Sequence, residues 1–260
     1  MIYDHREPGH AKRAYAEMMI EMDKRIGDVL DALQQSGADR NTLLLFFSDN
    51  GATGPGSCGQ LYGMKGTLWE GGHRVSGIAC WPGAIKAGTV QSQLACTIDV
   101  MPTILDFAGV SLLAEHNLDG ISLTEILTES HIGAERKLFW KYGDAISMRD
   151  GDWKLVVNGG RPPKPRDALP HINWHHPADG REELALFDLG NDLGEMSNLA
   201  ARQAERAEAM NAEIESWLRK VLVDATVQPE KAKIEQSNRR LTQVLSGVLS
   251  RTFALHALAN

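Results

Sequence analysis

One apolar run, followed at once by polar residues and a glycine-rich loop, constrains the fold of this 260-residue chain more than any other feature. The run is Leu43 to Phe47, and residues 48–51 (SDNG) follow it directly. A continuous run of this length is typical of a strand buried on both faces of a parallel sheet. Ligands of open α/β sheets bind just beyond the carboxyl ends of the strands. We therefore expect a site at Asp49 and Asn50.

The same residues could instead have a purely structural role, either as a hairpin turn or as a polar strand end. Asn-Gly after a strand is the strongest short indication of a β-hairpin turn. A hairpin needs a second alternating strand immediately afterwards, whereas residues 52–59 (ATGPGSCG) have the composition of a loop. The sequence therefore disfavours a hairpin. A polar strand end without a function stays open as the alternative for Asp49 and Asn50.

The chemistry of these residues favours a hard cation. A carboxylate and an amide oxygen side by side are ligands that Ca²⁺ or Mg²⁺ accepts, although two oxygens complete neither shell. Lys65 follows in the loop, and the nearby Gly63 and Gly66 allow the backbone to approach a ligand closely. An ammonium beside a divalent cation suits a tetrahedral oxyanion such as sulfate or phosphate. By itself, Lys65 could equally be a solvated surface lysine.

Composition excludes several classes of partner. The net charge of −7 argues against a general nucleic-acid binder, which usually carries a basic face. No apolar run approaches the ~20 residues needed to span a bilayer. The three cysteines form neither a disulfide framework nor a zinc spacing. The first ten residues are polar and show no signal peptide, so the compartment is left open.

The first half of the chain predicts helices and strands in alternation. Residues 11–36 form a predicted helix that ends at Gly37, residues 74–81 a strand, and residues 99–109 a helix that Asp99 caps. This alternation indicates an α/β fold. Apolar side chains recur at helical spacing in the first helix, and we expect them to face a core: Met19, Met22, Ile26, Val29, Leu30 and Leu33.

The second half predicts a small antiparallel sheet with a packed helix. Residues 137–142, 145–157 and 184–189 are predicted strands, with a turn at Asp150-Gly151. Residues 200–222 form a predicted closing helix. We therefore expect a catalytic α/β part over 1–130, a small α+β subdomain over 131–222 and an extra helical tail over 223–260.

One loop in this half invites a metal interpretation. Residues 161–176 contain His171, His175 and His176 among several prolines. The prolines and the irregular histidine spacing favour a plain surface loop over a metal site. A role for this loop in contacting substrate is the alternative.

Five segments in a fixed order resemble the second half of a sulfatase of the arylsulfatase type. They are SDNG, GMKGTLWEGGHRV, IACWPGAIKAG, TIDVMPTILDFAG and LDGISL. The resemblance implies an alkaline-phosphatase-like central sheet with flanking helices and hydrolysis of sulfate esters. It further implies that Asp49 and Asn50 bind Ca²⁺, in preference to Mg²⁺, and that Lys65 contacts the sulfate group.

The chain departs from the family at the nucleophile. Sulfatases use a formylglycine made within a C-x-P-x-R motif, and Cys58, Cys80 and Cys96 all lack that context. The early Asp-Asp pair, the upstream lysine and the site histidines of the family are missing as well. We therefore expect the chain to be the C-terminal portion of a sulfatase, with no catalytic nucleophile of its own.

Three functions follow from these observations. The first is a sulfuric ester hydrolase acting on a sulfated small molecule or carbohydrate. The second is a related metal-dependent phosphoesterase, which the absence of D-x-x-x-H and H-x-H patterns after the central strand disfavours. The third is an inactive remnant, or a half that binds a separate N-terminal half, because a sheet cut in its middle exposes an apolar edge. Sulfatases are usually periplasmic, extracellular or lysosomal.

Overall fold

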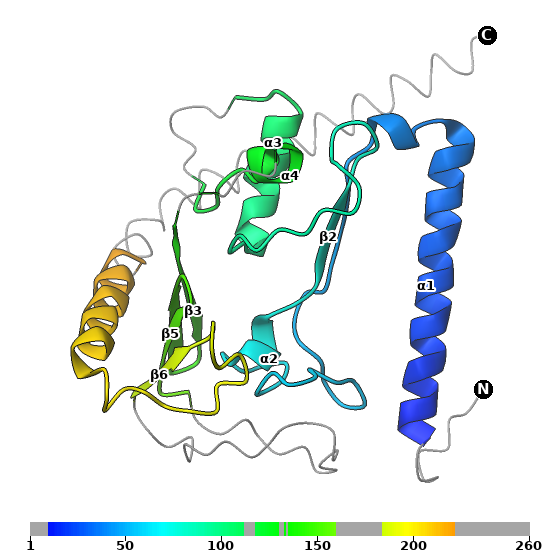
Figure 1. Cartoon of the computed structure of the whole chain (residues 1–260). Helices are drawn as coiled ribbons and strands as arrows, with labels where there is room; N and C mark the ends of the chain where they lie inside the picture. Colours follow the sequence, from blue (N-terminus) through cyan, green and yellow to red (C-terminus); the bar gives the residue numbers. More distant parts are fainter. Residues whose placement is uncertain (1–9, 112–117, 130–132, 134, 160–183, 222–260) are drawn as a thin grey trace, which may run out of the picture. The chain divides into compact units, whose positions relative to one another are not determined.

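The computed structural model describes residues 10–111, 118–129, 133, 135–159 and 184–221 (Figure 1). Contacts divide the chain into two units, residues 1–208 and 209–260. The predicted loop with His171, His175 and His176 and the predicted tail over 223–260 lie outside the described residues. The predicted three-part division of the chain stays a prediction.

The first unit begins with a long helix, α1 (His10–Ser36), and a short 3-10 helix, η1 (Asp39–Asn41). Gly37 ends α1 as predicted, since its φ of 71° is a left-handed conformation that glycine adopts at little cost. The prediction that the apolar face of α1 is core is wrong for most of its residues. Met19, Met22, Val29 and Leu30 are exposed, because no described element covers this face of the helix.

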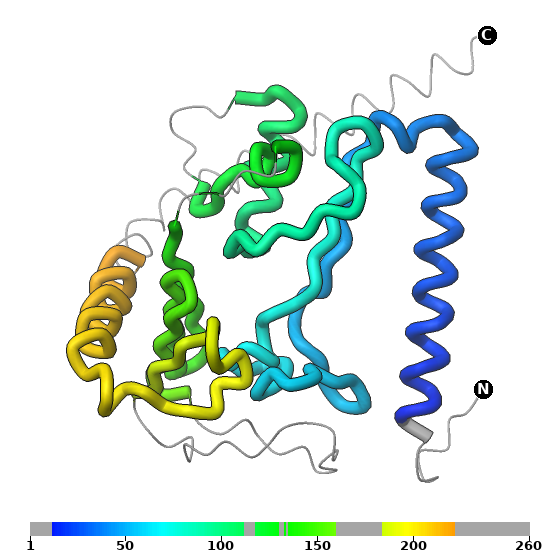
Figure 2. Tube along the Cα trace, in the orientation of Figure 1, coloured from blue at the N-terminus to red at the C-terminus, as the bar shows by residue number. Residues whose placement is uncertain are grey.

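A two-stranded sheet follows, formed by β1 (Leu44–Phe47) and β2 (Gly77–Cys80). The strands are antiparallel, with Leu44 opposite Cys80 and Phe47 opposite Gly77. The prediction of a doubly buried parallel strand is therefore wrong among the described residues, and the side chains of β1 are half-buried or exposed. The connection, residues 48–76, contains no helix longer than the four-residue α2 (Glu70–His73) and returns the chain beside β1 in the opposite direction (Figure 2).

Short helices occupy the connections: α2 (Glu70–His73), η2 (Thr97–Asp99), α3 (Val100–Phe107) and α4 (Thr124–Thr128). Asp99 is fully buried and structural, but its carboxylate does not cap α3. It accepts the backbone N–H groups of Cys96 and Ile121 and pairs with Arg136 at 2.6 Å. One buried carboxylate thus joins three segments.

The second sheet confirms the predicted small antiparallel sheet. Its order is β3-β4-β5-β6, and every neighbouring pair is antiparallel. The predicted turn at Asp150-Gly151 is displaced by one residue, because Asp150 pairs with Trp153 and Gly151 and Asp152 form the turn. The strands are β3 (Lys137–Tyr142), β4 (Ala145–Asp150), β5 (Trp153–Val157) and β6 (Leu184–Asp188).

Residues 204–221 are helical, which agrees with the closing helix predicted from the sequence. Arg206 in its first turn lies over the ring of Trp153 in β5, with its guanidinium carbon 4.2 Å from the ring centroid. A cation–π contact of this kind stabilises by about 0.5–1 kcal/mol when exposed. No helix in the described part of the chain is long and apolar enough to cross a membrane.

The loop between β1 and β2 packs on the second sheet through aromatic contacts. Tyr62 and Trp69 meet edge to face with ring centroids 5.2 Å apart, and Trp69 meets Phe187 of β6 at 5.8 Å. The cluster also includes Val156, Ala185 and Leu189, and all of these side chains are buried. This core therefore fixes the loop that carries Lys65 against strands that lie far away in the sequence.

We predict that Phe187→Ala lowers the free energy of unfolding by about 3–5 kcal/mol, because it opens a cavity under Trp69. Urea unfolding followed by tryptophan fluorescence measures the change. Val90→Ala is the control, since Val90 is 94% exposed and its truncation should change stability by less than about 0.5 kcal/mol. Equal midpoints for Phe187→Ala and the wild type would contradict the placement of this core.

Candidate functional site

The predicted metal ligands lie where the sequence puts them, just after β1. Asp49 is exposed and Asn50 is half-buried. The Ser48 hydroxyl donates to the Asn50 carbonyl at 2.9 Å and closes the turn. Asp49 therefore presents its carboxylate to solvent, where a ligand can reach it.

Lys65 lies on a loop that the backbone ties to this turn. The Lys65 N–H donates to the Ala52 carbonyl at 3.0 Å, and the Gly51 N–H donates to the Gly72 carbonyl at 2.9 Å. The Lys65 side chain is exposed. The structure thus brings the segment of Asp49 and Asn50 together with the segment of Lys65, although it does not test the role of any of the three.

Glycines permit this close approach. A Cβ on Gly51 would lie 1.8 Å from the Gly71 carbonyl oxygen, and one on Gly72 would lie 2.2 Å from the Thr67 carbonyl oxygen. Real side chains do not tolerate such distances, so both positions require glycine. This packing gives the glycines of the WEGG segment a structural role.

Glu70, the first residue of α2, lies buried beneath this loop. Its carboxylate is 2.9 Å from Lys154 Nζ, 3.3 Å from His73 Nε2 and 3.2 Å from Arg74 Nη1. Arg149 of β4 approaches it at 3.6 Å. Burial opposes ionisation, but the Lys154 ammonium and the hydrogen bond from His73 outweigh it and hold the pKa of Glu70 far below its usual value.

Lys154 of β5 is fully buried and lies between two carboxylates. Its Nζ is 2.9 Å from Glu70 Oε1 and 2.8 Å from Glu195 Oε1. His73 Nε2 is 3.1 Å from the same nitrogen. Burial, together with the Lys154 charge, lowers the pKa of His73. The His73 ring packs against Trp140, with ring centroids 4.6 Å apart.

Glu195 completes the cluster from the loop after β6. Its backbone adopts a φ of 54°, which is uncommon for a residue with a side chain, and its Oε2 accepts the Glu70 N–H at 2.7 Å. Burial raises the pKa of Glu195 to about 7, although Lys154 acts in the opposite direction. We refer to Glu70, Lys154 and Glu195 as the buried charge cluster.

The sequence predictions missed two of these three residues. The sequence contains one indication of the role of Lys154, since this lysine lies inside an otherwise apolar strand, WKLVV. Charged side chains almost never become fully buried without a partner, so that lysine could have indicated a buried ion pair. The sequence around Glu195 contains no such indication, because its segment, GEMSN, has an ordinary loop composition.

The described residues do not form a complete metal site. Among them, no group of three or more His, Cys, Asp or Glu side chains could hold a metal ion. The oxygens of Asp49 and Asn50 fit Ca²⁺ in chemical type, and the exposure of Asp49 leaves room for further ligands. A full shell would need oxygens from outside this part of the chain.

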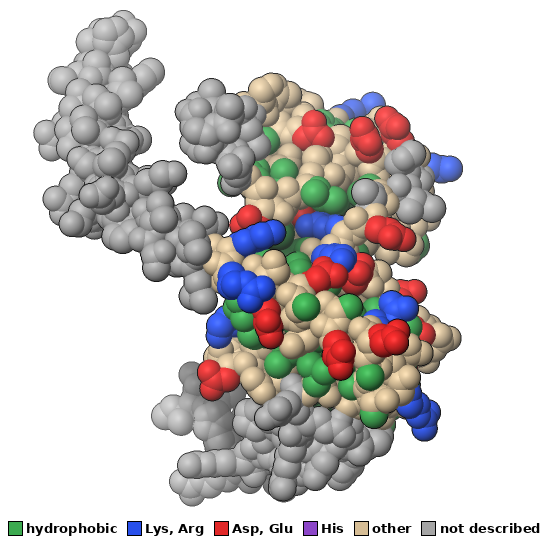
Figure 3. Space-filling model, turned by 90° about the vertical axis from the view of Figure 1, so that its left-hand side faces the viewer, with side chains coloured by type: hydrophobic (Ala, Val, Ile, Leu, Met, Phe, Trp, Pro, Cys, Tyr) green, Lys and Arg blue, Asp and Glu red, His purple; other side chains and the backbone are tan. Residues whose placement is uncertain are grey.

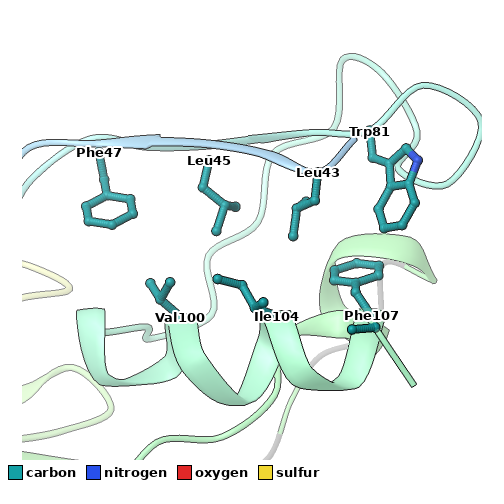
Figure 4. Close-up of a pocket in the computed structure, with 8 residues that line it drawn as sticks. Leu43, Leu45, Phe47, Trp81, Val100, Ile104 and Phe107 are labelled. Carbon is teal, nitrogen blue, oxygen red and sulfur yellow. The ribbon is translucent and has the colours of Figure 1, made fainter. Parts of the chain in front are cut away.

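A groove between β1 and α3 is apolar and therefore differs from this site. It has a volume of about 460 Å³ (Figure 4). The side chains of Leu43, Leu45 and Phe47 point toward Val100 and Ile104 across it. The groove offers no charged group to a sulfate ester.

On the face of the molecule that Figure 3 shows, acidic and basic side chains are interspersed.

Comparisons with known proteins identify the class. The sulfatase family model matches residues 3–110. The chain is 32% identical to bovine arylsulfatase A over 251 residues, and the match covers 91% of this chain and 49% of that protein. It is 31% identical to a sulfatase of Formosa agariphila, with 82% and 40% of the two chains covered. The chain thus spans about half the length, or less, of these relatives.

Solved structures agree on the fold. The crystal structure of Ps i-CgsB superposes with a TM-score of 0.65 at 23% identity and covers 80% of this chain and 43% of its own. The PsFucS1 sulfatase from Pseudoalteromonas sp. superposes with a TM-score of 0.59 at 28% identity, over 76% and 42% of the two chains. The mixed α/β fold is therefore of the alkaline-phosphatase-like class, as predicted. The chain belongs to the sulfatase family.

We predict that the ionisation of Glu195 makes the free energy of unfolding depend on pH. A folded-state pKa raised above the unfolded value of 4.5 contributes stability below pH 4.5, and that stability is lost as the pH rises through about 7. The unfolding free energy of the wild type minus that of Glu195→Gln should therefore fall by roughly 1–3 kcal/mol between pH 5 and pH 8. The lowered pKa of His73 makes the unfolding free energy rise with pH, which is the opposite effect. Both proteins contain His73, so subtracting one unfolding free energy from the other removes this contribution.

Urea unfolding of both proteins at several pH values measures this difference. Asp144→Asn, on the exposed β3–β4 turn, serves as the matched control and should give a flat difference. A difference for Glu195→Gln that rises with pH would show that Glu195 is already ionised in the fold at pH 5.

Proposed function

We propose that this chain provides the calcium-binding and sulfate-binding side of a sulfuric ester hydrolase. Membership of the sulfatase family supports the reaction class. One observation supports the assignment of the site: the hydrogen bond from the Lys65 N–H to the Ala52 carbonyl, which ties the Lys65 loop to the segment that follows Asp49 and Asn50. Asp49, Asn50 and Lys65 are the site residues of this proposal.

Each residue has a distinct chemical role in this proposal. The Asp49 carboxylate and the Asn50 amide oxygen would hold Ca²⁺ at the end of β1. The bound ion supplies positive charge to the oxygens of the sulfate group. The exposed Lys65 ammonium donates a hydrogen bond to another sulfate oxygen and stabilises the negative charge that develops as the S–O ester bond breaks.

The nucleophile of the proposed reaction comes from outside these 260 residues. The family's formylglycine requires a C-x-P-x-R motif, and Cys58, Cys80 and Cys96 are free cysteines without it. Burial raises the pKa of the Cys58 thiol, which also makes it a poor nucleophile in its own right. Activity of this chain therefore depends on a nucleophile supplied by further polypeptide.

Sulfated carbohydrates are the proposed substrate class, with sulfated small molecules as the alternative. One relative is the N-acetylgalactosamine-6-sulfatase of Rattus norvegicus, 30% identical over 219 residues. A crystal structure of Ps i-CgsB with a neocarrahexaose also superposes on this chain, with a TM-score of 0.65. Both names concern carbohydrate ligands of those proteins, and the proposal extends that class to this chain.

We predict that Asp49→Ala abolishes the binding of Ca²⁺, because it removes the only negatively charged ligand in the proposed set. Isothermal titration calorimetry of the chain reconstituted with the polypeptide that completes the site measures the affinity. Asp144→Ala, an exposed aspartate on the β3–β4 turn, is the matched control and should bind like the wild type. Unchanged affinity in Asp49→Ala would remove Asp49 from the site.

A second candidate function is that of a half that binds a separate N-terminal half. Exposed apolar side chains favour it: Met18 and Ile20 on α1 are 68% and 70% exposed, and Ile78 on β2 is 58% exposed. Unpartnered apolar surface of this extent is typical of an interaction face. The chain spans half or less of the length of its relatives, which therefore contain further polypeptide.

We predict for this candidate that the chain self-associates when expressed alone. Co-expression with the part of the F. agariphila sulfatase that lies outside the match should yield a one-to-one complex by sedimentation velocity. Ile78→Asp, on the exposed face of β2, should prevent that complex, whereas Val90→Asp should not. A monodisperse monomer that unfolds cooperatively would contradict this candidate.

A further inference from the structure

The buried charge cluster connects two regions that the sequence separates widely. Lys154 lies in the second sheet, Glu195 in the loop after that sheet, and Glu70 in the helix that follows the Lys65 loop. All three are buried, and two carboxylates face a single ammonium at 2.9 and 2.8 Å. An arrangement of this kind costs desolvation energy. Apolar residues of similar size would therefore stabilise an ordinary core at least as well.

We propose that Lys154 is a positioning residue that holds Lys65 beside Asn50 by acting through Glu70 and α2. The role of Lys65 itself rests on the function proposed above. Lys154 touches neither a ligand nor the reacting atoms, so it is not a catalytic residue. Its part is to anchor the loop that presents Lys65.

The connection runs through a hydrogen bond at every step. Lys154 Nζ donates to Glu70 Oε1 at 2.9 Å, and the Glu70 N–H donates to Glu195 Oε2 at 2.7 Å. One residue further along α2, the Gly71 N–H donates to the Tyr62 carbonyl at 2.7 Å and closes the base of the Lys65 loop. The anchored helix therefore fixes both ends of that loop.

The same helix also fixes the segment of Asp49 and Asn50. The Gly72 carbonyl accepts the Gly51 N–H at 2.9 Å, and the Lys65 N–H reaches the Ala52 carbonyl at 3.0 Å. Gly51 and Gly72 have no space for a Cβ, so the backbone segments cannot slide without separating. A loosened α2 would therefore move Lys65 away from Asn50.

A purely structural role is the competing explanation, and a charge-balanced double variant separates the two. Lys154→Met with Glu195→Gln removes one positive and one negative charge from the cluster. Glu70 keeps Arg74 at 3.2 Å and Arg149 at 3.6 Å, so no buried carboxylate loses all its partners. The amide that Glu195→Gln introduces still offers an oxygen to the Glu70 N–H. The sheet should therefore keep its stability, while α2 loses the hydrogen bond that Lys154 donates to Glu70.

Hydrogen exchange of the full chain, followed residue by residue by NMR, is the test. We expect the amides of Gly51, Lys65 and Gly71 to exchange at least about tenfold faster in the double variant, with β3–β6 unchanged. Lys137→Met is the matched control, since Lys137 forms an exposed ion pair with Asp150 in the same sheet. Wild-type protection at Lys65, or equal loss throughout the sheet, would overturn the proposal.

A milder variant covers the case in which the double variant does not fold. Glu70→Gln leaves Lys154 paired with Glu195 and weakens the contacts that Glu70 makes with Lys154, Arg74 and Arg149. It should raise the exchange rates of Lys65 and Gly71 several-fold. Unaltered rates in Glu70→Gln would contradict the positioning role.

Binding of inorganic sulfate in the presence of Ca²⁺ adds a readout that a folding role alone would not move. Calorimetry should show at least about tenfold weaker sulfate binding in the double variant, although Lys65 is intact. If the wild-type chain binds no sulfate, the proposed function fails, and the exchange rates alone decide the positioning role. If binding is equal in both proteins, Lys154 does not position Lys65.

Discussion

A single buried ammonium, that of Lys154, joins the two parts of the structure on which the proposed function depends. It lies between the carboxylates of Glu70 and Glu195, at 2.9 and 2.8 Å. Through Glu70 it anchors α2, whose backbone holds both the Lys65 loop and the end of β1. Because both carboxylates pair with this one ammonium inside the core, buried charges hold α2 and the loop of Glu195 against the second sheet.

Local patterns in the sequence were sufficient for the elements that depend on local chemistry. Helical spacing and a terminal glycine gave the bounds of α1 to within one residue, and alternation with turn residues gave the sheet β3–β6. The order of five short segments gave the family, and the family model and the relatives confirm it. The site residues Asp49, Asn50 and Lys65 come from the same segments and stay predictions.

The predictions that were wrong or incomplete concern residues whose environment depends on partners far away in the sequence or outside it. Burial of the apolar face of α1 and of β1 was predicted from periodicity, but periodicity indicates that a face needs a partner and not that the chain supplies one. Met19 and Phe47 are accordingly exposed. Lys154 and Glu195 were missed because their pairing requires three segments to meet, which no local pattern encodes.

The most direct test of the account is an NMR titration of the calcium-loaded full chain with inorganic sulfate. The account predicts that the Lys65 side-chain resonances and the amides of Asn50 and Gly51 shift together along one binding curve, because the two loops form one site. Shifts confined to other surface lysines such as Lys86, with Lys65 and Asn50 unmoved, would contradict it.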